Sequence, residues 1–126
     1  MPQVKIHVAR ALPEKSKRRL VEEVRELIPE VLGLDPRIGQ VMLYESGFRA
    51  NHATRDPNFV FVEVTMYSGR TGELKQKLAE AIISKITQYT GVDQSDINLV
   101  YYELSPDNYF GGISHRPGIG EAAEEA

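Results

Sequence analysis

Two short stretches of the chain carry residues that could do chemistry together: Pro2 at the amino terminus and Gly69-Arg70 much later. Removal of Met1, which a small second residue favours, would leave Pro2 with a free secondary amine. A desolvated pocket and a neighbouring cation both lower the pKa of an amine, which can then act as a base near neutral pH. Arg70 would bind a substrate carboxylate and stabilise an enolate. The pair therefore indicates proton transfer on a small carboxylate.

Other uses of the same residues stay open. With its amine still charged, Pro2 would act as an acid while water attacks the substrate. If Met1 is retained, the nitrogen of Pro2 is an amide and cannot act as a base, and Pro2 is then only the start of a strand. Arg70 could equally sit in a turn and form an ion pair with Glu73.

The elements that must position these residues follow from hydrophobic periodicity. Alternating residues predict strands at 3–8, 40–45, 59–67 and 97–104. Apolar residues at helical spacing predict one helix between Pro13 and Gly33, which are typical start and stop residues, and a second over 72–90.

The second half of the chain repeats the first at an offset of 58 residues. Val4-Lys-Ile-His-Val aligns with Val62-Glu-Val-Thr-Met, and Tyr44-Glu aligns with Tyr102-Glu without a gap. Each half is a β-α-β unit, whose two strands should be parallel. We expect an α+β fold, in which the tandem β-α-β repeat forms a four-stranded mixed sheet with two helices on one face. An apolar open face on so small a chain predicts association with further copies.

The whole chain, residues 1–126, is expected to form a single domain. Repeat one spans about 2–45, a polar connector 46–58, repeat two about 59–112 and an acidic tail 113–126. The two halves differ where chemistry is suspected: Pro2 falls opposite Val60, and Gly69-Arg70 opposite Ala11-Leu12. If a pseudo-twofold relates the halves, their first strands lie close together, and Pro2 and Arg70 face one pocket.

Composition excludes several classes of function. The chain has no cysteine, which excludes disulfides, thiolate metal sites and a cysteine nucleophile and fits a reducing compartment. No apolar run suits a membrane helix or a signal peptide, so we expect a cytoplasmic protein with no membrane partner. A net charge of −3 argues against nucleic acid as a partner. His52 and His115 have no second ligand at metal spacing, and no phosphate loop or dinucleotide fingerprint occurs, so neither a metal nor a cofactor is expected.

Three motifs resemble the tautomerase superfamily: Pro2-Gln-Val-Lys-Ile-His-Val, Ser68-Gly-Arg-Thr-Gly-Glu-Leu, and Asn108-Tyr-Phe-Gly-Gly. The resemblance spans roughly the first 112 residues. Its prototype is 4-oxalocrotonate tautomerase, and its fused members include malonate semialdehyde decarboxylase and cis-3-chloroacrylate dehalogenase. The resemblance implies a β-α-β fold, a homotrimer, Pro2 as the catalytic amine and Arg70 as the carboxylate binder.

The resemblance also implies that Asn108, Tyr109 or Phe110 lines the pocket, and Tyr67 and Tyr101 are placed to reach it. Two bland interpretations stand beside these. Aromatic residues on strands usually serve packing, and the 108–110 segment could be a contact between subunits of the trimer.

Departures from the fused members narrow the chemistry. Those members carry a second arginine shortly before Gly69-Arg70, where this chain has Tyr67 and Ser68, and the acid nearest the final glycines is Asp107. The prototype's arginine on the second strand is replaced by Gln40 and, in the second half, Asn98. We expect a cofactor-free tautomerase acting on a small 2-oxo or enol carboxylate. The alternatives are a hydratase, dehalogenase or decarboxylase of a three-carbon acid, and a non-catalytic trimeric binding or scaffold protein.

Overall fold

The computed structural model describes residues 1–112, so the predicted acidic tail and His115 lie outside the described residues. Two β-α-β units follow each other. The first consists of β1 (Gln3–Val8), α1 (Glu14–Leu32) and β2 (Gln40–Glu45). The second consists of β3 (Val60–Tyr67), α2 (Gly72–Thr90) and β4 (Ile97–Leu104). Single turns of 3-10 helix, η1 (Gln94–Asp96) and η2 (Pro106–Asn108), flank β4.

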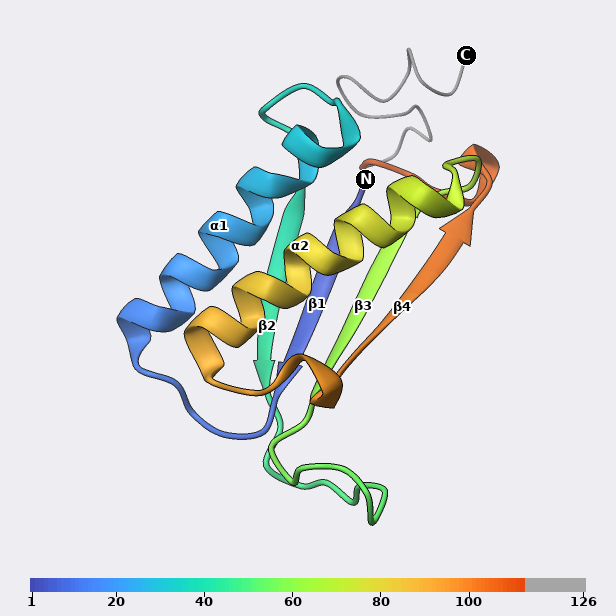
Figure 1. Cartoon of the computed structure of the whole chain (residues 1–126). Coiled ribbons are helices and arrows are strands. Elements are labelled where there is room, and N and C mark those ends of the chain that lie inside the picture. The colour runs from blue at the N-terminus through green and yellow to red at the C-terminus, as the bar shows by residue number, and fades with distance from the viewer. Residues whose placement is uncertain (113–126) are drawn as a thin grey trace.

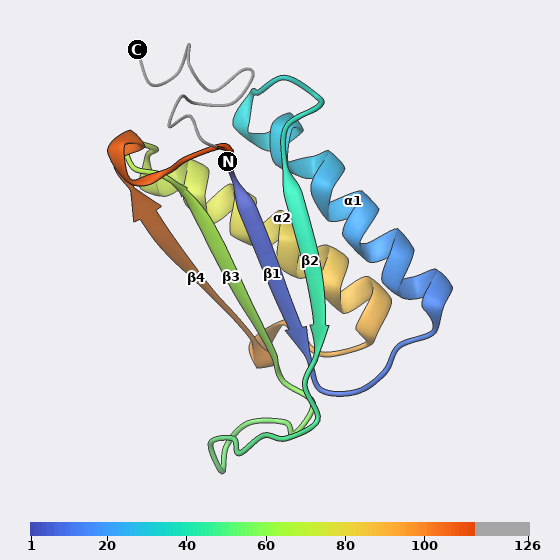
Figure 2. The same ribbon diagram turned by 180° about the vertical axis from the view of Figure 1, so that it is seen from behind.

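The four strands form one mixed sheet in the order β2-β1-β3-β4 (Figure 1). Within each unit the two strands are parallel, and the central strands β1 and β3 are antiparallel, with Gln3 opposite Thr65 and His7 opposite Phe61. Both helices cover the same face, and the reverse view shows the other face bare (Figure 2). The structure thus confirms the predicted α+β architecture.

The core lies between this sheet and the helices, because alternate residues of the central strands point toward α1 and α2. These strand residues are buried: Val4, Ile6, Val8, Val60, Val62, Val64 and Met66. They meet the buried stripes of the two helices: Leu20, Val24, Ile28, Leu78, Ile82 and Ile86. Burial of this apolar surface is the main term that stabilises the fold.

The bare face of the sheet is mixed rather than apolar. His7 Nε2 lies 2.6 Å from a carboxylate oxygen of Glu63, and the imidazole stacks between Tyr44 and Phe61 at centroid distances of 5.1 and 5.9 Å. The hydrogen bond with His7 lowers the pKa of Glu63, which in turn raises the pKa of the Tyr102 phenol. A polar chain therefore crosses this face among aromatic rings.

The connector between the two units leaves the body of the molecule at the end of the sheet opposite the amino terminus (Figure 1). Arg49 fixes its base, donating to the carbonyl oxygens of Phe59 and His7 and lying 4.1 Å from the Phe59 ring centroid. Burial lowers the pKa of Arg49. Within residues 1–112, neither helix has the length and apolar character that crossing a bilayer requires.

Candidate active site

Pro2 lies at the end of the sheet where β3 ends and α2 begins. It immediately precedes β1, is buried, and accepts a hydrogen bond at its carbonyl oxygen from the amide of Gln40 (3.3 Å). Because β1 and β3 are antiparallel, the start of β1 lies beside the end of β3 at Tyr67. The amino terminus therefore lies near the turn that carries Arg70 (Figure 1).

Arg70 is held against the end of β3. It follows Gly69, whose φ of +117° is a value that side chains rarely adopt. The Arg70 guanidinium donates through Nη1 to the carbonyl oxygen of Tyr67 at 3.3 Å, so the side chain folds back over the strand. Helix α2 begins directly afterwards, capped by the Thr71 hydroxyl, which accepts from the amide of Leu74 at 3.2 Å. The guanidinium and the positive end of α2 both favour an anion here.

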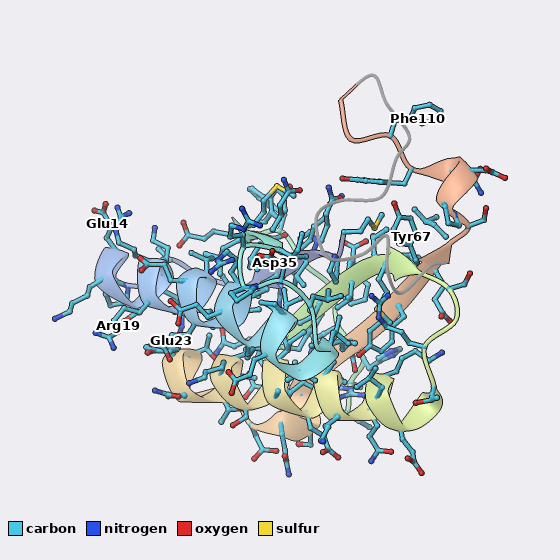
Figure 3. All side chains as sticks on the ribbon, turned by 90° about the horizontal axis from the view of Figure 1, so that it is seen from above. Glu14, Arg19, Glu23, Asp35, Tyr67 and Phe110 are labelled. Atoms are coloured by element: carbon cyan, nitrogen blue, oxygen red, sulfur yellow. The ribbon has the colours of Figure 1, made fainter. Side chains whose placement is uncertain are left out.

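Tyr67 and Tyr109 meet at this end of the sheet. Tyr67 is completely buried, and the ring of Tyr109 approaches it edge-to-face, with centroids 5.9 Å apart and an interplanar angle of 82°. Figure 3 shows Phe110 on the segment that leaves the sheet on the side away from the helices. Phe110 is 57% exposed and Asn108 is exposed at the end of η2. The structure thus gathers Pro2, Tyr67, Arg70 and Tyr109 at one end of the sheet, with Asn108 and Phe110 at its margin.

Tyr101 is not part of this group. It pairs with Val64, faces the helices, and donates through its hydroxyl to the carbonyl oxygen of Lys75 in α2 (2.5 Å). Burial raises the pKa of the Tyr101 phenol to about 12. The side chain therefore joins β4 to α2, on the face opposite Tyr67.

Sequence reasoning missed the position of Met1. Its side chain is buried, with only 7% of its surface exposed. The unprocessed methionine thus fills space directly beside Pro2, and its removal would both free the amine and vacate that space. No local pattern predicts this burial, because it depends on the packing of distant segments around the chain end.

The larger surface cavities lie elsewhere. One of about 590 Å³ lies between the helices and is lined by Glu22, Glu26 and Lys85 among others. Another of about 480 Å³ follows the end of α2. Among residues 1–112, no group of three or more histidine, aspartate or glutamate side chains could hold a metal ion.

Comparison with known proteins follows this geometry. The family model described as tautomerase enzyme matches residues 39–111, more than half of the chain. No curated protein sequence matches. The fold resembles FG41 malonate semialdehyde decarboxylase inhibited by 3-bromopropiolate (24% identity, 88% of this chain and 89% of that chain, TM-score 0.73). It also resembles Pt0534 inactivated by 2-oxo-3-pentynoate (23%, 98% and 99%, 0.80) and Q0 fused 4-OT, a symmetric trimer (19%, 96% and 98%, 0.80).

Proposed function

Because this chain belongs to the tautomerase enzyme family, we propose that it is a cofactor-free isomerase that moves a proton on a small 2-oxo or enol carboxylate. The observation that carries this proposal is the placement of buried Pro2 at the same end of the sheet as Arg70. In this proposal Pro2 is the base and acid, and Arg70 is the carboxylate binder.

The proton transfer follows from these roles. After loss of Met1, the Pro2 nitrogen removes a proton from the carbon next to the 2-oxo group. The C–H electron pair becomes the C2=C3 double bond, and the carbonyl π pair moves to the oxygen. Arg70 binds the carboxylate, and together with the α2 amino terminus it stabilises the negative enolate. The charged amine then returns the proton to the enolate oxygen, which gives the enol.

We also propose that the chain works as a homotrimer. Q0 fused 4-OT, which has a similar fold over most of both chains, is a symmetric trimer. The bare face of the sheet exposes three large side chains: Met42 (41%), Tyr44 (40%) and Tyr102 (47%). Further copies would cover them. The proposed partners are therefore a small carboxylate and identical chains.

Kinetics of three variants test the catalytic roles. Intact-mass measurement first establishes that Met1 is absent. We then expect turnover of phenylpyruvate or 2-hydroxymuconate by the wild type, and a loss of about 10²–10⁴-fold in kcat for Pro2→Ala, the usual contribution of a positioned acid-base group. Arg70→Ala should raise KM and lower kcat, whereas Lys77→Ala, which removes an exposed lysine on α2, should match the wild type. Equal rates in all variants would overturn the proposal and favour the non-catalytic scaffold.

Hydration, dehalogenation and decarboxylation need more than these two residues. They require a carboxylate that activates water or a second cation near the reacting carbon. The Asn108, Tyr109 and Phe110 side chains offer no carboxylate, and the nearest acid, Asp107, is exposed. Proton transfer therefore remains the function that the geometry supports best.

A further inference from the structure

Two basic side chains near this end of the sheet are already engaged by carboxylates. Arg37, in the loop that leads into β2, is held by both oxygens of Asp35 at 2.9 and 2.7 Å. Lys75, in the first turn of α2, lies 3.0 Å from a carboxylate oxygen of Glu103. Glu103 pairs with Met66, the next-to-last residue of β3, so this ion pair borders the site. A second substrate carboxylate would have to compete with a protein carboxylate for either cation.

The edge of the site next to β2 offers neutral groups instead. The amide of Gln3 donates to the amide oxygen of Gln40 at 2.8 Å, which commits these two side chains to each other. An amide lacks the charge needed to compensate a carboxylate that has lost its water. This edge therefore does not supply the missing second cation.

The space beside Pro2 is apolar and aromatic. The side chain of Met1 occupies it with 7% exposure, and Tyr67 and Tyr109 form an edge-to-face pair at the same end of the sheet. A hydrocarbon or aromatic group gains free energy on entering such a space, whereas a carboxylate loses hydration there. The group that replaces the Met1 side chain is therefore expected to be apolar.

We propose that the site selects a monocarboxylate with an apolar or aromatic tail over a dicarboxylate of similar length. Arg70 binds the single carboxylate, and the tail fills the space that Met1 vacates. For turnover this inference rests on the proposed function, and it then names the preferred substrate as an aryl or alkyl 2-oxo acid. For binding it stands by itself.

Calorimetric titration of the Met1-free protein with two unreactive acids tests the selection directly. We expect 3-phenylpropionate to bind at least tenfold more tightly than adipate, a dicarboxylate of similar length. Arg70→Ala should lose most of the affinity for 3-phenylpropionate, and Lys77→Ala should bind like the wild type. Equal or tighter binding of adipate would overturn the proposal.

The variant Glu103→Gln tests the reason for the preference. It releases Lys75 and changes an exposed side chain, so the fold should persist. We expect the preference for 3-phenylpropionate over adipate to shrink severalfold, and an unchanged ratio would refute the role of charge pairing. Turnover of phenylpyruvate and 2-hydroxymuconate by the same samples separates the two proposals. A binding preference without turnover sinks only the isomerase, whereas faster turnover of the dicarboxylate sinks only the selectivity.

Discussion

At the scale of single residues, Glu23 joins the two helices on their outer side. Its carboxylate accepts hydrogen bonds from Lys85 Nζ at 2.9 Å and from the Tyr89 hydroxyl, and Arg19 Nε lies 3.5 Å away. The hydrogen bonds from Lys85 and then Tyr89 lower the pKa of Glu23 from 4.5 to about 2. A carboxylate on α1 thus holds two side chains of α2 in place.

This lowered pKa makes a prediction for acid stability. Because the folded pKa lies below the unfolded one, the contribution of Glu23 is present above about pH 4.5 and is lost as the pH falls toward about 2. We expect Glu23→Gln to have a lower Tm than the wild type at pH 7, and the two Tm values to converge toward pH 2. Thermal denaturation followed by circular dichroism measures both. The exposed Glu30→Gln is the control, and a Tm difference that did not change with pH would contradict the assignment.

At the scale of elements, the two helices start differently. Helix α1 follows Pro13, which makes no side-chain cap, whereas the Thr71 hydroxyl caps α2. The cap matters for the site because Thr71 follows Arg70 directly, so fraying of α2 would also loosen the guanidinium. Stability and carboxylate binding therefore share one turn.

Substitution of the cap has a definite expected cost. Thr71→Ala leaves the amide of Leu74 without its side-chain acceptor and should lower the free energy of unfolding by about 1 kcal/mol, whereas Thr71→Ser should restore most of it. Urea denaturation gives both values. A neutral Thr71→Ala would show that water replaces the cap without loss.

At the scale of the whole molecule, the bare face of the sheet is the feature that remains to be covered. It carries exposed Met42, Tyr44 and Tyr102 around the polar pair of His7 and Glu63. Buried polar pairs of this kind are satisfied by each other, so further copies can cover them without orphaning a charge. The proposed trimer would use this face.

A charge placed on that face should prevent assembly. Met42→Glu adds a carboxylate where the proposed interface excludes water, so we expect sedimentation velocity to show a shift from trimer toward monomer at micromolar concentration. Lys77→Glu, on the exposed side of α2, should remain trimeric. If Met42→Glu stayed trimeric, copies of the chain would meet through another surface.

The fold could be predicted because burial imposes a period on the sequence. Val4, Ile6 and Val8 alternate, and the offset of 58 residues carries the same pattern into β3. The offset also held unused information: Tyr101 aligns with Leu43, which packs against the core, so the repeat already placed Tyr101 on the helix side. The contact between Tyr67 and Tyr109 could not be predicted, because it depends on how the chain returns after β4.

The burial of Met1 bears on the order of events during synthesis. An exopeptidase reaches a terminal residue most easily while the first strand is still unpaired, and in the folded chain only 7% of Met1 is exposed. Trimming and folding therefore compete for the same nascent chain. If Pro2 is the proposed base, this competition sets the active fraction, so that two preparations of one sequence can share a fold and differ in activity.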